Sequence, residues 1–240
     1  MNQQTSSPPV YLSIPQDCSY LPDRQSQMLF LDPEYPITPA LYDQLLAMGF
    51  RRSGRLIYRP HCPHCGACVP VRIPVAEFEP SRGQRRTLKK NADLAIVITQ
   101  PRLDDELFDL YSRYQNLRHP GAGMDNPNTD SYTEFLVHSP VHSLFVEFRE
   151  PTKNRLLSVA VIDQQPDSLS AVYTFFDPDT ANRGLGTLAV LWQVQQALAQ
   201  SRPFVYLGYW IDKCQKMQYK KQFRPIEAFN DEGWTRLGRK

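Results

Sequence analysis

The feature that most constrains the fold is a strand, a turn and a helix that follow one another without a break over residues 169–199. β-Branched, aromatic and aliphatic residues fill positions 169–176, and the turn-forming sequence Asp-Pro-Asp ends the run. Apolar residues recur at helical spacing from Leu188 onward. The segment therefore predicts a buried strand and a helix packed on it. Glycines at 183–187 would let backbone N–H groups approach an anion at the helix N-terminus.

The turn at the start of this helix resembles the loop that meets the pyrophosphate of coenzyme A in the N-acetyltransferase-like (GNAT) fold, where the pattern is Arg/Gln-x-x-Gly-x-Gly/Ala. Arg183 and Gly186 match the pattern, but Leu188 stands where the small residue should be. The resemblance implies an acyl-transferring domain with a mostly antiparallel mixed sheet. The departure favours an acyl carrier other than coenzyme A. A glycine pair that only starts a helix is the alternative.

Length and composition set the outer limits of the interpretation. A chain of 240 residues, 41% hydrophobic and 22% charged, has room for one large or two modest globular domains. No run approaches the ~18 apolar residues of a membrane span, and the first ten residues lack the pattern of a secretory signal. We therefore expect a cytoplasmic protein without a membrane partner. Since the net charge is only +2, nucleic-acid contacts would need local clusters of Lys and Arg.

The order of motifs predicts an α+β protein in two domains. Residues 1–14 are polar and proline-bearing, which predicts a disordered tail. Residues 15–100 are expected to form a small N-terminal α/β domain with a cysteine cluster, including a helix that starts at Thr38-Pro39 and one strand over 50–59. Residues 101–240 are expected to form the GNAT-like domain.

Three cysteines recur at intervals of three, and a fourth lies far upstream. The spacing suits a turn around one tetrahedral zinc ion or one iron–sulfur cluster. Reduced structural cysteines or a redox-sensitive thiol pair are the alternatives. The candidate ligands are Cys18, Cys62, Cys65 and Cys68.

Two segments combine features that suit RNA. Half of the positions in 81–90 are Lys or Arg, enough to bind several phosphates if the side chains face one groove, although a solvated face is the usual role of such a run. Segment 209–224 interleaves cations with aromatic residues that could stack on a base. A helix whose lysine stems cover apolar surface is the alternative for the second segment.

Several blocks together resemble one family, the aminoacyl-tRNA protein transferases, and most closely its bacterial aspartate/glutamate leucyltransferase branch. The matching blocks run from Cys18 to Phe229 and are Cys18-Ser-Tyr-Leu21, Cys62 to Pro74, Tyr173 to Asp179, Tyr206 to Ile211 and Lys216 to Lys220. The resemblance implies transfer of leucine from leucyl-tRNA to the N-terminal amine of proteins beginning with Asp or Glu, which marks them for degradation in the N-degron pathway. Eukaryotic arginyl transferases carry Cys-x-Tyr-Cys and a Cys-Cys pair associated with metal, whereas this chain has Leu21 and a Cys-x-x-Cys-x-x-Cys.

The implied chemistry needs no cofactor, because an aminoacyl ester is already activated and an α-amine with a pKa near ~8 is partly neutral at pH 7. The enzyme must position both reactants, accept a proton and stabilise an oxyanion. We expect Asp177 to accept the proton and Tyr173 to orient the ester, with turn formation as the alternative for Asp177. Arg72, Lys216 and Lys220 are candidates for binding the acidic N-terminal residue. The candidates for tRNA binding are Arg82, Arg85, Arg86, Lys89, Lys90, Arg183, Gly184, Gly186, Lys213 and Tyr219.

Three other functions remain open from sequence. The donor could be arginyl-tRNA, since no residue distinguishes the two donors. A coenzyme-A-dependent N-acyltransferase would need the Arg183 turn to bind a pyrophosphate. A metal-clipped RNA-binding protein would bind RNA without turnover and unfold when a chelator removes the ion.

Overall fold

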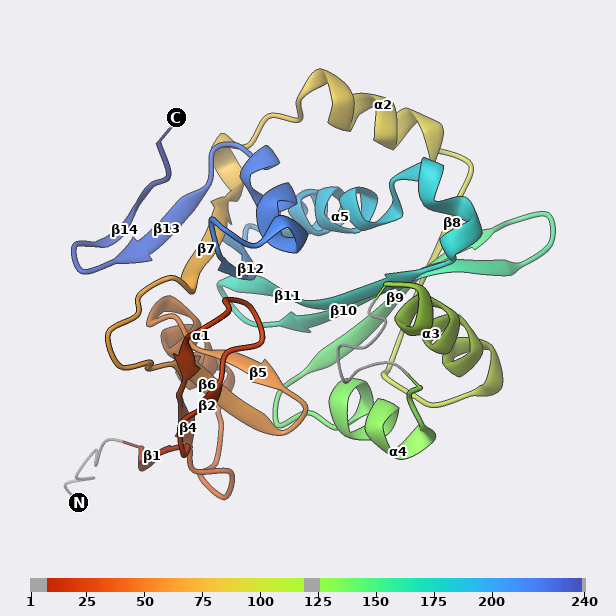
Figure 1. The fold of residues 1–240 in the computed structure, drawn as a ribbon. Helices are drawn as coiled ribbons and strands as arrows, with labels where there is room; N and C mark the ends of the chain where they lie inside the picture. The colour runs from red at the N-terminus through yellow and green to blue at the C-terminus, as the bar shows by residue number, and fades with distance from the viewer. Residues whose placement is uncertain (1–7, 119–125, 239–240) are drawn as a thin grey trace, which may run out of the picture.

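The computed structural model describes residues 8–118 and 126–238, and one large mixed sheet forms its centre (Figure 1). The strand order is β14-β13-β7-β12-β11-β10-β9-β8. β11 and β12 pair in parallel, and the other neighbours in this sheet pair antiparallel. The protein is therefore α+β with a mostly antiparallel sheet, as predicted. The strands are β7 (Val69–Pro74), β8 (Ala95–Thr99), β9 (Ser143–Glu150), β10 (Arg155–Gln164), β11 (Ser168–Phe176), β12 (Phe204–Trp210), β13 (Glu227–Asn230) and β14 (Gly233–Arg236).

Helices cover both faces of this sheet (Figure 1). Helix α5 (Leu185–Ala199) lies on one face and buries Leu188, Leu191 and Val194 against the strands, with α2 (Arg82–Lys90) outside it. Helix α3 (Asp105–Arg118), α4 (Thr129–Tyr132) and the π-helical turn 133–137 cover the other face. The strand, turn and helix predicted over 169–199 are thus confirmed as β11, a 3₁₀ turn and α5.

A smaller sheet at the N-terminal side has the order β1-β4-β6-β5, and α1 packs on it. Helix α1 starts as predicted, because Thr38 accepts a hydrogen bond from the N–H of Leu41. The single strand expected over 50–59 is wrong. It is a hairpin that turns at Gly54 with φ +58°, where a Cβ would lie 2.3 Å from the Glu134 carbonyl oxygen. The elements are β1 (Val10–Leu12), β4 (Met28–Leu31), α1 (Pro39–Ala47), β5 (Arg51–Ser53) and β6 (Leu56–Pro60), beside a small pair of β2 (Gln16–Asp17) and β3 (Gln25–Ser26).

The structure differs from the sequence-based expectations about the N-terminal tail and about the boundary between the two halves. Part of the segment expected to be a tail is a strand, since β1 pairs with β4, while residues 1–7 lie outside the described residues. The large sheet also crosses the expected boundary near residue 100, because β7 and β8 belong to it. A buried ion pair joins the two sheets, with Arg52 Nε 2.8 Å from Asp163 Oδ2 and both side chains fully buried. The two predicted halves therefore share a core.

One edge of the large sheet is formed by β8, which pairs with β9 on one side. Its residues Ile96, Val97 and Ile98 are 43, 39 and 52% exposed, so this edge is both apolar and open. Within residues 8–118 and 126–238, the helices are too short or too polar to cross a bilayer.

Candidate functional site

Strands β11 and β12 separate after a short parallel start. Their register pairs Ser168–Ser170 with Phe204–Tyr206, whereas β11 continues to Phe176 and β12 to Trp210. On its other side β12 pairs with β7 along its whole length, from Phe204 to Trp210, with an irregularity between Tyr206 and Gly208. The predicted Tyr173 on β11 and the segment after β12 thus lie on either side of the separation.

Tyr173 faces α3 in a cluster of aromatic rings. Its hydroxyl donates to Gln115 Oε1 at 3.2 Å, and its ring centroid lies 5.2 Å from that of Phe135. Burial, followed by the neighbouring Tyr114 and Tyr111, raises the pKa of Tyr173 above its ordinary value. At neutral pH the side chain is therefore an uncharged phenol that can orient a polar group but cannot act as a base.

Tyr219, from the segment that follows β12, lies near the same turn of α3 as Tyr173 does. It lies in the 3₁₀ helix η4 (Gln215–Gln222) and is 44% exposed. Burial around its hydroxyl and the nearby Tyr114 raise the pKa of Tyr219, while Arg118 lowers it. Because Tyr114 and Arg118 also act on Tyr173, the two phenols lie within electrostatic range of one turn of α3. The structure brings these two predicted residues into one neighbourhood.

Asp177 lies at the end of β11, away from Tyr173. Asp177 follows Tyr173 by four positions in the chain, a separation of about 13 Å at the ordinary strand rise. Its side chain is fully buried and accepts hydrogen bonds from Arg113, Arg155 and the N–H of Asp179. Burial would raise the pKa of Asp177, but the hydrogen bonds from Asp179 and Arg113 and the charge of Arg155 outweigh it and hold that pKa below its ordinary value. These contacts correspond to the turn-forming alternative, and a carboxylate held this way is a weak base.

Arg72 on β7 already has an internal carboxylate partner. Its Nε lies 2.8 Å from Glu227 Oε2, and the guanidinium carbon lies 3.6 Å from the Phe204 ring centroid and 4.2 Å from that of Trp234. The side chain is only 12% exposed. This arrangement ties β7 to β13 and leaves little of the guanidinium for a ligand.

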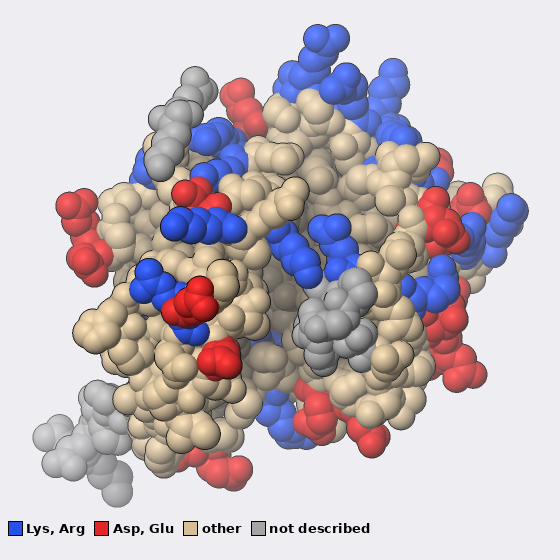
Figure 2. Space-filling view, viewed as in Figure 1, with Lys and Arg blue, Asp and Glu red and all other residues tan. Residues whose placement is uncertain are grey.

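The basic window at 81–90 is helix α2, with its cations outward. Ser81 and Gln84 form a capping box, and Gln84 Nε2 donates to the Gln222 carbonyl at 3.0 Å, so the buried side of the helix is fixed. The exposed residues are Arg82, Arg85, Arg86, Lys89 and Lys90. In Figure 2 Lys and Arg side chains gather along the edge where Figure 1 places α2, and others lie at a hollow near the middle of the same face.

A pocket of about 550 Å³ joins the end of α2 to the Arg183 turn. It is lined by Lys89, Lys90, Asp93, Asn182 and Arg183. Arg183 is partly neutralised there, because it forms an ion pair with Asp93 and donates to Asn91 Oδ1 at 2.9 Å. Gly184 has φ +67° and lies against Thr87, and Gly186 lies against Phe176. The structure thus brings Arg183 and the lysines of α2 together, away from Tyr173.

The lysines predicted in the last functional segment divide into two kinds. Lys213 and Lys216 are exposed, whereas Lys220 is only 8% exposed. Lys220 Nζ donates to the backbone carbonyl of Tyr209. Burial, reinforced by the charge of Arg51, lowers the pKa of Lys220 to about 7, although Cys214 opposes this shift. Among the described residues no carboxylate pairs with this buried amine, which sets Lys220 apart from the other predicted cations.

All five cysteines lie in one region of the structure. Burial raises the pKa of Cys68 to about 12, reinforced by Cys62, Cys18, Cys65 and Cys214, so all five thiols lie within electrostatic range. Cys62 Sγ exchanges hydrogen bonds with the backbone of Gln27 instead. Across the described parts of the chain, no three His, Cys, Asp or Glu side chains are placed to hold an ion. Zinc or iron–sulfur binding stays a prediction that elemental analysis would test.

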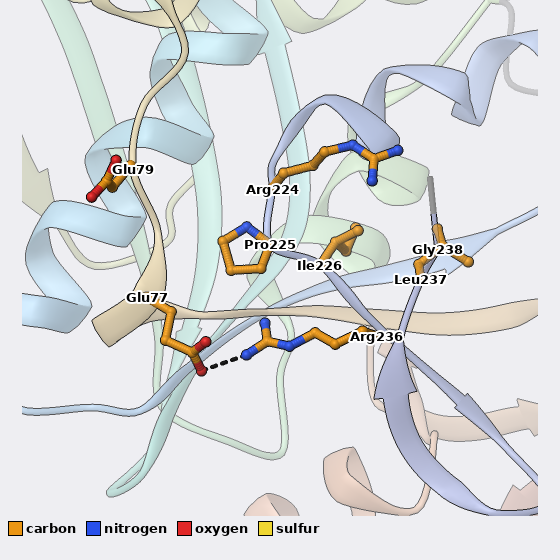
Figure 3. A pocket seen from close by; sticks show the side chains of 8 residues that line it. All are labelled: Glu77, Glu79, Arg224, Pro225, Ile226, Arg236, Leu237 and Gly238. Carbon is orange, nitrogen blue, oxygen red and sulfur yellow. Dashed lines mark ion pairs between the residues drawn. The ribbon is translucent and has the colours of Figure 1, made fainter. Parts of the chain in front are cut away.

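A second pocket, of about 460 Å³, lies near the C-terminus (Figure 3). Its lining includes Arg224 from the predicted RNA-binding segment 209–224 and consists of Glu77, Glu79, Arg224, Pro225, Ile226, Arg236, Leu237 and Gly238. Arg236 points toward Glu77 and forms an ion pair with it. Neither pocket includes Tyr173 or Lys220.

Arg51 on β5 was not predicted as a site residue. It is 5% exposed, and its Nε and Nη2 atoms are buried without a hydrogen-bond partner in the described structure. Burial lowers the pKa of Arg51 from its ordinary value, opposed by four tyrosines of which Tyr209 has the largest effect. No sequence signal distinguishes Arg51 from Arg52, since both lie in one Arg-Arg pair before a Ser-Gly turn.

Protein-family models match both parts of the chain. The model described as "Arginine-tRNA-protein transferase, N terminus" matches residues 16–86, and the one described as "Arginine-tRNA-protein transferase, C terminus" matches residues 106–230. The interval between the two matches contains the boundary predicted near residue 100, although the large sheet is continuous across it.

Curated relatives match over nearly the whole chain. An aspartate/glutamate leucyltransferase of Pseudomonas fluorescens (strain SBW25) is 51% identical over 227 residues, 95% of this chain and 96% of the relative. One of Pseudomonas aeruginosa (strain LESB58) is 49% identical over the same shares. Solved structures are more distant: the crystal structure of FemX has a TM-score of 0.49 at 9% identity, covering 85% of this chain and 82% of FemX. That of L-PGS from Bacillus licheniformis has a TM-score of 0.46 at 11% identity, covering 72% of this chain and 51% of L-PGS.

Proposed function

The chain belongs to the arginine-tRNA-protein transferase family, whose members transfer an aminoacyl group from tRNA to protein, and we propose that it transfers leucine from leucyl-tRNA to an N-terminal Asp or Glu. The observation that carries the proposal is the likeness to leucyltransferases at about half identity over 95% of the chain. The reaction would take place in the cytoplasm and would mark acceptor proteins for the N-degron pathway.

In the proposed reaction the acceptor's neutral α-amine attacks the ester carbonyl of leucyl-tRNA, the bond from that carbonyl carbon to the terminal ribose oxygen breaks, and the ribose oxygen leaves as a hydroxyl with the proton that the amine gives up. Because the ester is activated, most of the barrier reduction would come from holding both reactants in place. We place the ester near Tyr173, whose uncharged hydroxyl can donate to a carbonyl or ribose oxygen. Partly buried Phe135, Tyr114 and Val172 offer an apolar surface for the leucyl side chain.

We assign the tRNA body to α2 and the Arg183 turn, and the 3′ end to the region between Tyr173 and Tyr219. Five outward cations on one capped helix support the first assignment, since phosphate contacts mainly position a nucleic acid. Tyr219, exposed beside Lys213 and Lys216, supports the second, because bases stack readily on an exposed aromatic ring. Asp177 has no role in the proposed reaction, because it lies away from Tyr173 and its carboxylate, bound by Arg113 and Arg155, is a weak base.

We also propose a GNAT-like scaffold for the second half, supported by the parallel unit β11–α5–β12. Coenzyme A is disfavoured as the carrier, because Leu188 is in the core and Arg183 is bound to Asp93 and Asn91. Leucine is favoured over arginine as donor by the names of the relatives.

The test is incorporation of labelled leucine or arginine from charged tRNA into peptides that begin with Asp, Glu or Ala. We expect transfer of leucine to the Asp and Glu peptides alone. Transfer of arginine, or no transfer to either acidic peptide, would contradict the proposal. Saturable coenzyme A binding measured by calorimetry would favour the N-acyltransferase alternative.

A further inference from the structure

Two buried cations lie close together without a carboxylate between them, at the junction of the small sheet and η4. We propose that Arg51, with Lys220 beside it, binds the side-chain carboxylate of the acceptor's N-terminal Asp or Glu. This inference rests on the proposed function and assigns its acceptor specificity to residues other than Arg72.

Arg51 is fixed in place by its backbone contacts and by aromatic rings. Its Nη1 donates to the carbonyl oxygens of Leu46 and Phe50, and its guanidinium carbon lies 5.0 Å from the Tyr206 ring centroid and 5.8 Å from that of Tyr209. These contacts hold the guanidinium plane but satisfy only one of its three nitrogens. The orientation of the group is therefore set before any ligand arrives.

The nitrogens left over are Nε and Nη2, which form one side of the guanidinium fork. On that side two N–H bonds run nearly parallel, which matches the two oxygens of a carboxylate. Arg149 uses the same side for the carboxylate of Glu147, with Nε at 2.8 Å and Nη2 at 2.7 Å from one oxygen, Oε2. Arg52, next to Arg51 in sequence, uses its Nε for Asp163 and its Nη2 for Ser143. In Arg51 that side is buried and has no partner within the described residues.

Lys220 supplies the second cation. It shares Tyr209 with Arg51, since Nζ donates to the Tyr209 carbonyl while Arg51 lies over the ring. The charge of Arg51 acts on Lys220 directly, and of the other titratable groups Cys214 also acts on it. No carboxylate among residues 8–118 and 126–238 forms an ion pair with either side chain within 4.0 Å.

Burying two cations without an anion is unfavourable, because both lose hydration and repel each other. Such an arrangement gains most from a small anion that enters and pairs with them. Lys220 lies close to a partly exposed stretch of backbone, because Gly208 is partly exposed and a Cβ on it would lie 3.7 Å from Lys220 Nζ. We therefore assign this pair to a small carboxylate on a flexible side chain, and the phosphates of tRNA to the exposed cations of α2.

The experiment compares leucine transfer to peptides that differ only in their first residue, Asp or Asn, for the wild type and Arg51→Gln. Loss of a bidentate charged pair should raise KM for the Asp peptide about 100-fold. The preference for Asp over Asn should largely vanish, and KM for leucyl-tRNA should stay within about twofold. Arg51→Lys, which keeps the charge but loses the fork, should recover only part of the preference. It also serves as the second variant if Arg51→Gln folds poorly.

Arg59→Gln is the matched control. Arg59 also stacks on an aromatic ring, that of Phe50 at 5.1 Å, and also donates to a backbone carbonyl, that of Met48, but it lies outside the cation pair. It should keep the wild-type preference. A folded Arg51→Gln protein that still prefers Asp over Asn would overturn the inference while leaving the proposed function intact. Failure of the wild type to transfer leucine to the Asp peptide would overturn the proposed function itself.

Proton uptake gives a readout that a purely structural role would not produce. A bound carboxylate should raise the pKa of Lys220 from about 7, so at pH 8 the Asp peptide should take up more protons on binding than the Asn peptide. Calorimetry in two buffers of different ionisation enthalpy measures the difference. In Lys220→Met the difference should disappear, and equal uptake by both peptides in the wild type would count against Lys220 as part of the site.

Discussion

At the scale of single residues, Asp177 shows how a charged side chain can serve the fold. Two arginines and one backbone N–H bind its buried carboxylate. Its lowered pKa means that the unfolded chain binds more protons than the folded one as the pH falls below about 4. The stabilisation by Asp177 is therefore fully present above the unfolded pKa and is lost as the pH falls through the folded pKa.

We predict that Asp177→Asn lowers the free energy of unfolding by about 1 to 3 kcal/mol at pH 7, through the loss of charged hydrogen bonds. Because both arginines are more than 40% exposed, the loss should stay below that of a fully buried pair. Urea denaturation at pH 7 and pH 3 measures it, and the gap between variant and wild type should narrow at the lower pH.

The same variant separates a structural from a catalytic role. The pH dependence of kcat near neutrality should keep its wild-type shape in the folded variant. A large loss of kcat with unchanged stability would instead restore Asp177 as the proton acceptor.

The adjacent residues Arg51 and Arg52 show that the sequence alone does not reveal which cation forms an ion pair. Arg51 and Arg52 look alike in sequence, yet Asp163 from the large sheet pairs with Arg52 alone. Arg72 was a reasonable candidate for a carboxylate, but the carboxylate that it meets is Glu227, 155 residues away. Long-range pairing of this kind is decided by the fold, so no local pattern reveals which cation is left over.

At the scale of elements, helix α2 presents its charged side chains to solvent. Its buried side is fixed through Gln84, and its cations point outward. We predict that the double variant Arg86→Ala/Lys89→Ala weakens tRNA binding and reduces the slope of log K against log salt by about 1.4 to 1.8, since each phosphate contact contributes ~0.7 to 0.9. Fluorescence anisotropy between about 50 and 200 mM salt measures the slope.

A charge-matched control removes two exposed cations elsewhere. Arg55→Ala/Lys153→Ala changes the hairpin turn at 54–55 and the turn between β9 and β10. It should leave the slope at the wild-type value. Equal effects of both double variants would mean that tRNA responds only to total charge.

Elements with strong local signals were predictable, and those that depend on distant partners were not. Thr38 with Pro39 marked the start of α1, and the apolar spacing after Gly186 marked α5. The hairpin over 50–59 was missed because its turn is shaped by Gly54 packing against Glu134. The β13–β14 hairpin was not predicted, and its position depends on pairing with β7.

At the scale of the whole molecule, the large sheet makes the two halves depend on each other. Strand β7 comes from the first half and lies between β12 and β13 of the second. We predict that residues 101–240 alone do not unfold cooperatively, because β12 loses its neighbour and the β13–β14 hairpin loses its attachment. Circular dichroism during urea titration tests this.

A longer fragment provides the control. Residues 69–240 restore β7 and β8 and should regain a cooperative transition, though a weaker one than the full chain because Asp163 still lacks Arg52. A cooperative transition of 101–240 equal to that of 69–240 would show that the second half is an independent domain.

The division into two family segments was visible in sequence because their motifs are contiguous, whereas the shared sheet was not. Strands β7 and β12 are separated by 129 residues between Pro74 and Phe204, which are register partners. The sequence of neither strand indicates which strand it pairs with. Composition and motif order therefore identify the family and the reaction, while the placement of Arg51 and Lys220 beside Tyr209 requires the completed fold.

The open edge at β8 also has a practical consequence. In the described part of the chain no strand pairs with the outer edge of β8, so its backbone amides, beside exposed isoleucine and valine, can pair with a strand from another molecule. Concentrated solutions of the protein should therefore aggregate on storage sooner than the net charge suggests, and Val97→Lys should delay this aggregation.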